Sequence, residues 1–258
     1  MNTAGLPPAQ GRTSGDSGDQ GNLTLDALER APRFNRWMYE AVKPWLGQRI
    51  AELGAGKGNL SNFFRHHGAL LLTDYRDDYL AGLRARFADA DRLEFAKLDM
   101  SRAEDFETLR PFHPDTAVFL NVLEHIEDDR LVLQRLYDVL PPGCRVVVLV
   151  PYNMRLYSGF DRELGHFRRY AKGELEGKME EAGLKVLRQF FFNRAGTLAW
   201  YLANTLGRRR SLTPTQLSLY NFFTPVLQKL DPILPLSGLS TIVVAEKTED
   251  QKTASLPR

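Results

Sequence analysis

The sequence predicts an α/β protein whose core is a doubly wound parallel β-sheet with helices on both faces. Segments of strand character alternate with segments of helical character from about residue 49 to residue 182. Strands that are separated by helices pair as parallel neighbours through crossover connections. The run 145–150 is almost wholly Val and Leu, which is typical of a strand that is buried on both faces.

The predicted elements follow this alternation along the chain. A helix is expected over 25–42, with Leu28, Phe34, Trp37 and Met38 as apolar residues and Pro44 at its end. The next five strands are expected at 49–53, 70–74, 93–98, 117–120 and 145–150. Helices are expected at 58–66, through 83–87, at 129–140 and at 172–182. Two further segments, 186–192 and 241–246, are candidates for closing strands.

Composition divides the chain into one domain and two tails. Residues 1–22 and 249–258 are poor in bulky apolar side chains, so we expect both tails to be disordered. The domain between them, 23–248, contains an aromatic-rich insertion at about 193–239.

Charge and hydropathy exclude several classes of protein. The net charge of +2 gives no overall basic field for nucleic acid. The N-terminus lacks the pattern of a signal peptide, and no segment has the roughly 20 apolar residues of a membrane span. We therefore expect a cytoplasmic protein, with contact to a membrane surface left open. The run Arg208–Arg210 is expected to be a solvated helix end, and the alternative is a contact with phosphate or anionic lipid.

The sharpest motif is the segment Glu52–Asn59, which reads ELGAGKGN. It follows the first predicted strand, where ligands bind in doubly wound folds. Gly54, Gly56 and Gly58 let the backbone turn sharply beside a ligand. A dinucleotide fingerprint would have glycine at Asn59, and the acid Glu52 would repel a pyrophosphate but favour an ammonium group.

Two more acids end the next strands. Asp74 ends the second strand, where a carboxylate can accept hydrogen bonds from ribose hydroxyls. Asp99 ends the third strand and is placed to meet an adenine amino group.

With these motifs in this order, the sequence resembles class I methyltransferases that depend on S-adenosylmethionine (SAM). The segment Asn121–His125 (NVLEH) is similar to the small-molecule branch, and Leu164–Tyr170 (LGHFRRY) is similar to bacterial members associated with glycosyltransferases. The resemblance covers about 35–247. It implies a Rossmann-like, mostly parallel seven-stranded sheet with a reversed last strand, and SAM as the cofactor. It also implies a set of cofactor-binding residues: Glu52, Gly54, Ala55, Gly56, Gly58, Asp74, Tyr75, Asp99, Met100 and Asn121.

Methyl transfer requires the acceptor to be aligned and, where needed, deprotonated. His125 and His166 fall where a base could act. The alternatives are a packing residue for His125 and a loop anchor tied to Arg168, Arg169 or Tyr170 for His166. We find no His, Cys and Asp residues at metal-ligand spacing, so we expect no metal site.

The acceptor is expected to be a small molecule, which could be hydrophobic or linked to a lipid or sugar. Oxygen is the expected acceptor atom. The aromatic-rich insertion, completed by the helix around Arg36, Trp37 and Tyr39, would line an apolar pocket, and Tyr152 is a further candidate. The alternative for the insertion is core packing. We expect no nucleic-acid substrate, because Asn121–Leu123 lacks the Pro-Pro-aromatic block of base-modifying enzymes.

Two other functions remain open at this point. An NAD-dependent oxidoreductase would share the early strands, and a SAM-fold subunit without activity could stabilise a partner. The oligomeric state, monomer or homodimer, is not indicated.

Overall fold

The computed structural model of the protein describes residues 29–207 and 214–248. The predicted disordered tails and the run Arg208–Arg210 lie outside the described residues, as does the start of the helix expected from residue 25.

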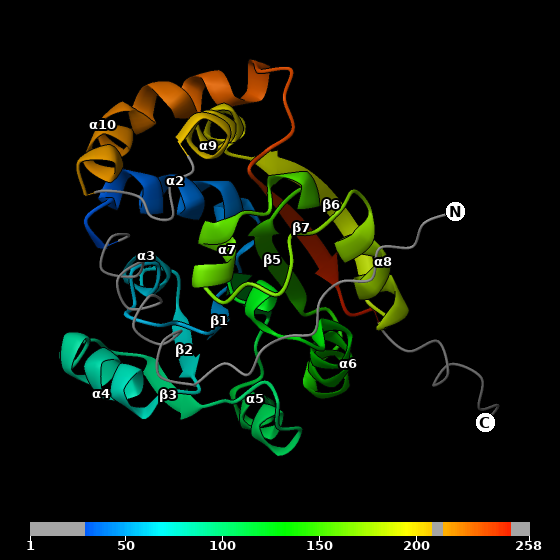
Figure 1. The fold of residues 1–258 in the computed structure, drawn as a ribbon. Coiled ribbons are helices and arrows are strands. Elements are labelled where there is room, and N and C mark those ends of the chain that lie inside the picture. The colour runs from blue at the N-terminus through cyan, green and yellow to red at the C-terminus, as the bar shows by residue number, and fades with distance from the viewer. Residues whose placement is uncertain (1–28, 208–213, 249–258) are drawn as a thin grey trace.

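Seven strands form one sheet in the order β3-β2-β1-β4-β5-β7-β6 (Figure 1). Only β7 is antiparallel to its neighbours β5 and β6; the other pairs are parallel. This confirms the predicted mostly parallel sheet with a reversed last strand. The strands are β1 Arg49–Leu53, β2 Ala69–Asp74, β3 Leu93–Lys97, β4 Thr116–Leu120, β5 Arg145–Pro151, β6 Lys185–Phe192 and β7 Ser240–Glu246.

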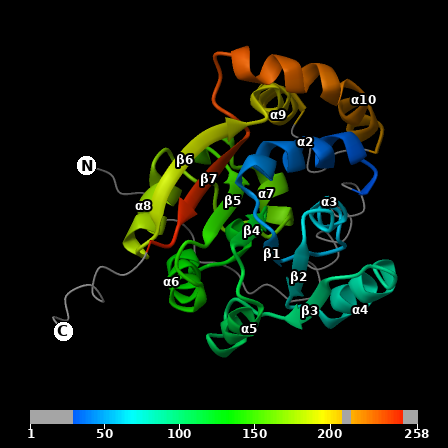
Figure 2. The same cartoon turned by 180° about the vertical axis from the view of Figure 1, so that it is seen from behind.

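Helices cover both faces of the sheet (Figures 1 and 2). The α-helices are α2 Pro32–Val42, α3 Ser61–Phe64, α4 Asp77–Arg86, α5 Leu109–Phe112, α6 Asp129–Val139, α7 Gly159–Glu163, α8 Glu174–Glu181, α9 Arg194–Gly207 and α10 Pro214–Leu230. Short 3₁₀ helices are η1 Lys43–Trp45, η2 Glu104–Thr108, η3 Leu123–His125, η4 Met154–Leu156 and η5 Asp231–Ile233.

Alternate residues of the central strands enter two separate cores. On β5, Val146 and Val148 join the cluster under α5, α6 and α8, whereas Val147 and Leu149 join the cluster under α2, α3 and α4. Side chains alternate across a strand, so the apolar run is explained by burial on both faces.

The aromatic-rich insertion forms α9, η5 and α10, which lie beside α2 at one end of the molecule (Figure 2). Asn221 on α10 accepts hydrogen bonds from the backbone N–H groups of Arg33 (2.9 Å) and Phe34 (3.3 Å). These N–H groups in the first turn of α2 lack partners within their own helix, so α10 caps α2.

One predicted helix is much shorter than expected. The segment expected at 58–66 contains only the four-residue helix α3. Gly58 has a φ of +77°, which an α-helix cannot contain. The helix therefore begins after the glycine loop and not within it.

None of the helices within 29–207 and 214–248 combines the length and apolar character that crossing a bilayer requires.

Candidate functional site

A cavity of about 1170 Å³ opens at the carboxyl ends of β1, β2, β4 and β5. The strand order changes direction at β1, and such switch points hold the ligand in doubly wound folds. The cavity extends from the glycine loop after β1 to the helices α7, α9 and α10.

The loop after β1 passes close under the segment that follows β4. The N–H groups of Gly54 and Ala55 both bond to the carbonyl of Thr73, at 3.0 and 2.8 Å. Gly54 has a φ of +75°, and a Cβ atom there would lie 2.8 Å from Cγ2 of Val122. Any larger residue at Gly54 would therefore displace the wall of the cavity.

Glu52 lies near the end of β1 with 6% of its surface exposed. Its Oε2 accepts a 2.5 Å hydrogen bond from the Ser61 hydroxyl. Burial raises the pKa of Glu52 to about 8; the Ser61 bond opposes this rise and the nearby Asp74 carboxylate adds to it.

Asp74 ends β2 and is held by two backbone donors. Its Oδ2 accepts from the N–H of Gly56 at 2.9 Å and its Oδ1 accepts from the N–H of Arg76 at 3.0 Å. Burial raises the pKa of Asp74, and these backbone bonds oppose the rise. Each oxygen keeps a second lone pair that can accept from a ligand hydroxyl.

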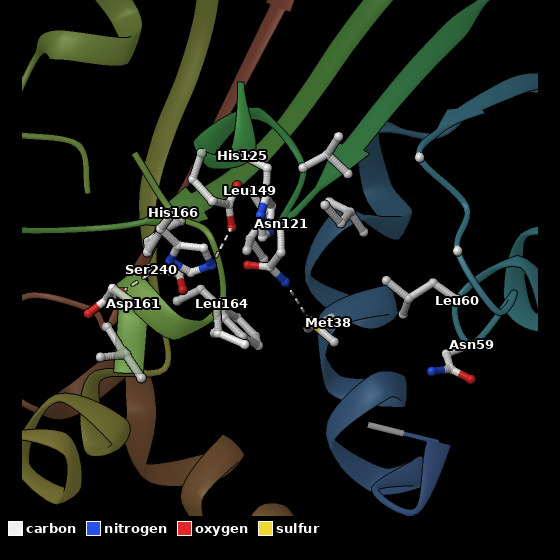
Figure 3. Close-up of a pocket in the computed structure, with 18 of the residues that line it drawn as sticks. Met38, Asn59, Leu60, Asn121, His125, Leu149, Asp161, Leu164, His166 and Ser240 are labelled. Atoms are coloured by element: carbon white, nitrogen blue, oxygen red, sulfur yellow. Dashed lines mark hydrogen bonds and ion pairs between the residues drawn. The ribbon is translucent and has the colours of Figure 1, made fainter. Parts of the chain in front are cut away.

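Asp99 and Asn121 follow β3 and β4. Oδ1 of Asp99 accepts from the backbone N–H of Ser101 (2.9 Å) and from its hydroxyl (2.7 Å). Asn121 has a φ of +57° and its N–H donates to the carbonyl of Leu149 at 2.9 Å. Asn adopts this conformation more readily than most residues, and its side chain reaches toward Met38 of α2 (Figure 3).

The cavity brings together all the predicted cofactor residues except Gly58. A Cβ atom on Gly58 would lie 2.7 Å from Leu83 Cδ2 and 2.9 Å from Phe87 Cε2. This glycine permits the loop to pack on α4, and it does not line the cavity.

The helix α2 lines the cavity with other residues than the sequence predicted. Phe34, Asn35 and Met38 line the cavity, whereas Arg36, Trp37 and Tyr39 do not. The Tyr39 hydroxyl instead pairs with His67 at 2.9 Å. Tyr152 is also absent from the lining, and its ring packs against Phe191.

His125 and His166 lie together on the far side of the cavity (Figure 3). Their ring centroids are 4.7 Å apart in an edge-to-face arrangement. His125 ends η3, where surrounding protein and then His166 lower its pKa to about 3, although its ring is exposed to the cavity. His125 is therefore a neutral imidazole at physiological pH.

His166 is tied to a buried ion pair. Its Nδ1 lies 3.1 Å from Oδ1 of Asp161, and the same oxygen accepts from Nε of Arg169 at 2.8 Å. Asp161 lies in a buried position that opposes ionisation, but the bonds from His166 and Arg169 leave its pKa below the usual value. His166 is therefore anchored in its loop, as one of the two alternatives expected. The link to Arg169 is indirect, because both side chains bind the same oxygen of Asp161.

Sequence reasoning missed Glu124, which lies beside both histidines. Its carboxylate is fully buried, and Oε1 is 3.9 Å from Nε2 of His166. Glu124, His125 and His166 each offer an atom that could bind a metal ion, all within 4.8 Å of one another. No ligand spacing in the sequence indicated this group, because residues 124 and 166 are far apart along the chain and meet only in the fold.

Apolar side chains from the helices after β5 also line the cavity. They come from α7 and the following turn, from α9 and from α10: Phe160, Leu164, Ala199, Trp200, Leu219, Tyr220, Phe223 and Leu227.

Comparison with known proteins agrees with this geometry. Residues 51–146 match the family described as "Methyltransferase domain". A search of curated proteins finds no match. The matched segment runs from β1 into β5 and includes most of the cofactor-side residues.

Three solved structures share the fold. A chain from the complex of Haloferax volcanii Trm112, a methyltransferase activator, with a methyltransferase has a TM-score of 0.56 at 16% identity, covering 91% of this chain and 95% of that one. A SAM-dependent methyltransferase from Mesorhizobium loti has a TM-score of 0.54 at 17% identity, covering 81% and 97%. The N-methyltransferase NodS from Bradyrhizobium japonicum, solved with S-adenosylhomocysteine, has a TM-score of 0.53 at 13% identity, covering 83% and 85%.

Residues 51–146 thus match a methyltransferase domain, and the described chain has the fold of the solved SAM-dependent methyltransferases to which it is similar.

Proposed function

We propose that the protein transfers the methyl group of SAM to an oxygen atom of a small acceptor that is apolar or linked to a lipid or sugar. One observation carries this proposal. A single cavity joins two buried acidic strand ends, Glu52 and Asp74, to a group of one carboxylate and two imidazoles.

The cofactor side suits a cation better than a phosphate. Glu52 and Asp74 are both buried and face one cavity, and the Asp74 carboxylate raises the cost of ionising Glu52. Glu52 would accept hydrogen bonds from the ammonium group of SAM, and Asp74 would accept from the ribose hydroxyls. A dinucleotide pyrophosphate would meet repulsion at Glu52.

The remaining cofactor contacts follow from position. Asp99 and Met100 would hold the adenine, and Asn121 would lie beside the methionine amino group. The backbone of Gly54, Ala55 and Gly56 would follow the methionine part, with Tyr75 at the mouth of the cavity. When bound, SAM supplies a methyl group on a sulfonium centre.

The histidine side would hold the acceptor hydroxyl. Asp161 accepts from Nδ1 of His166, which leaves the lone pair on Nε2 for the acceptor proton. His125 lies next to it and would orient the acceptor. Protein groups would thus align the oxygen and remove its proton.

The apolar helices favour a hydrophobic acceptor. Trp200, Phe160 and Phe223 border the cavity from three different helices. Pockets of this kind bind ligands mainly through apolar area, with a few polar groups that fix orientation.

Titration calorimetry with SAM, S-adenosylhomocysteine and NAD tests the cofactor. We expect saturable binding of the first two, weaker binding to Asp74→Ala, and no binding of NAD. Tight binding of NAD alone would favour an oxidoreductase.

A methyl-release assay over phenols, sugars and polyprenol-linked sugars tests the reaction. We expect turnover with at least one hydroxyl acceptor, reduced in His166→Ala. SAM binding without turnover of any acceptor would favour a SAM-fold subunit that has no activity of its own.

A further inference from the structure

The group formed by Glu124, His125 and His166 has the composition of a metal site. Glu124 and His125 lie on η3, directly after β4, and His166 lies in the turn that follows α7. Their potential ligand atoms lie within 4.8 Å of one another on the wall of the cavity. Two imidazoles and one carboxylate suit Zn²⁺ and its first-row neighbours better than Mg²⁺, which prefers oxygen ligands.

Glu124 has no hydrogen-bond partner to satisfy its charge. It is 0% exposed, and neither of its carboxylate oxygens makes a hydrogen bond to any residue in the described part of the chain. Nε2 of His166 lies 3.9 Å from Oε1, beyond hydrogen-bond distance. An isolated buried carboxylate is costly unless it is paired or binds a metal ion, so this side chain indicates a missing cation.

His166 already has the support that metal-bound histidines use. Asp161 accepts from Nδ1, and Arg169 and the backbone N–H of Ser158 hold that carboxylate, at 2.8 Å each. A carboxylate behind a histidine fixes the ring and its tautomer so that the other nitrogen faces the metal. Nε2 of His166 is the nitrogen on the side of Glu124, 3.9 Å from its Oε1.

We propose that Glu124, His125 and His166 bind one divalent first-row transition metal ion, with Zn²⁺ as the first candidate. Ligand atoms around Zn²⁺ lie about 3.3 Å apart, given metal–ligand distances of about 2.0–2.1 Å. The three groups must therefore move closer together on binding. His125 is exposed to the cavity and can turn, whereas Asp161 holds the ring of His166 and Glu124 is enclosed by its neighbours without a hydrogen bond to its carboxylate.

The ion would leave coordination positions open toward the cavity. There it would bind the acceptor oxygen, lower the pKa of the hydroxyl and release its proton to solvent. This role rests on the proposed function and assigns to the metal the task that a free imidazole would otherwise perform. Binding of the ion itself does not depend on SAM or acceptor.

The test uses the full chain after dialysis against a chelator. Zn²⁺ and Mg²⁺ are titrated calorimetrically, and Co²⁺ is added as a spectroscopic probe. We expect one Zn²⁺ per chain, no comparable binding of Mg²⁺, and visible absorption of Co²⁺ bound to nitrogen and oxygen ligands. Glu124→Gln and His125→Gln should each weaken Zn²⁺ binding at least about tenfold.

His113→Asn is the matched control. It removes an exposed histidine far from the cluster, at a position with a φ of 48° that Asn accommodates. This variant should bind Zn²⁺ as the wild type does. Stoichiometric binding that Glu124→Gln and His125→Gln leave unchanged would overturn the proposal, and so would the absence of one-to-one binding.

SAM titration of the same samples separates the two proposals. Binding of SAM without binding of a metal ion would reject the metal site and leave the methyltransferase proposal standing. Binding of a metal ion without binding of SAM would reject the methyltransferase proposal and leave the metal site standing.

Discussion

Ser61 donates a 2.5 Å hydrogen bond to the buried carboxyl group of Glu52 at the end of β1. The bond only partly offsets the cost of burial, and the Asp74 carboxylate adds to that cost, so the pKa of Glu52 is about 8. Glu52 therefore holds a proton at neutral pH in the free protein. A cationic ligand beside it would release that proton.

The first prediction concerns the pH dependence of cofactor affinity. If the ammonium group of SAM binds ionised Glu52, the association constant should rise about tenfold per pH unit between pH 6 and 7, where the cofactor amine keeps its proton. Calorimetry across this range measures the slope. Glu52→Gln should bind more weakly and lose the slope. An unchanged slope in this variant would assign the titration to another group.

The second prediction concerns the stability of the free protein. The pKa of Glu52 is raised from 4.5 when folded, so the folded state holds the proton more tightly than the unfolded state. Its contribution to the free energy of unfolding is fully present below about pH 4.5 and is lost as pH rises toward about 8. Glu52→Gln should therefore be more stable than wild type at pH 8 and similar at pH 5. Urea unfolding at both pH values tests this, and equal differences would contradict it.

The third prediction concerns Asp74. Its two oxygens accept from Gly56 and Arg76, whereas asparagine offers only one oxygen and places an amide N–H against a backbone donor. Asp74→Asn should lose about 1–3 kcal/mol of stability and at least about tenfold in SAM affinity. Asp77→Asn is the control; this exposed acid on α4 pairs with Lys97 at the surface, so the variant should keep its SAM affinity and lose at most about 1 kcal/mol of stability. Unaltered SAM affinity in Asp74→Asn would reject the ribose assignment.

The parts of the fold that the sequence predicted well are those with local signals. The strands agree with the predicted segments to within one residue, because most of them are apolar runs bounded by polar turns. The capping of α2 by Asn221 could not be predicted, since it depends on how two distant helices meet. The helix α3 is shorter than predicted because the predicted segment began at Gly58, whose φ of +77° does not occur in an α-helix.

The residues expected to bind the cofactor, except Gly58, line one cavity because they follow successive strand ends, which a parallel sheet brings to one edge. Their contacts with SAM stay a prediction. The Glu124 cluster was not predicted, because no spacing rule links residues 124 and 166. Only the packing of the segment after α7 against η3 joins them; the N–H of Phe167 donates to the carbonyl of Glu124 at 2.8 Å. Gly58 was expected to bind the cofactor because it belongs to the glycine motif. In the structure it does not line the cavity, and it permits close packing against Leu83 and Phe87.

The fourth prediction separates two costs of replacing a glycine. Gly54 and Gly143 have similar φ angles, +75° and +79°, but only at Gly54 would a Cβ atom meet a neighbour, Val122 at 2.8 Å. Gly143→Ala should cost about 1–2 kcal/mol from backbone strain alone. Gly54→Ala should cost about 1–3 kcal/mol more and weaken SAM binding. Adding Val122→Ala should restore part of that stability, and no restoration would mean that the clash is absorbed elsewhere.

The last prediction concerns the support of the LGHFRRY segment. Oδ2 of Asp129 accepts from the hydroxyl of Tyr170 and from Nζ of Lys178, both at 2.7 Å, and lies 2.9 Å from a guanidinium nitrogen of Arg168. Asp129 and Lys178 are both buried. Burial disfavours ionisation of Asp129, but the bonds from Lys178 and Tyr170 leave its pKa below 3.8.

Asp129→Asn should therefore destabilise the protein by roughly 3 kcal/mol at pH 7, because it removes the charge that Lys178 and Arg168 share and leaves the buried Lys178 only its ion pair with Glu174. The stability that this acid contributes is present above pH 3.8 and is lost as pH falls through its lower folded pKa, so the difference from wild type should shrink in acid. Asp138→Asn, which replaces an exposed acid on the same helix, should leave the free energy of unfolding unchanged.

The same ion pair should affect metal binding. Because Arg168 and Tyr170 closely follow His166 in the chain, the Asp129 variant should also bind Zn²⁺ less tightly. A stable variant with unchanged metal affinity would show that η3 and the segment after α7 stay together without this ion pair.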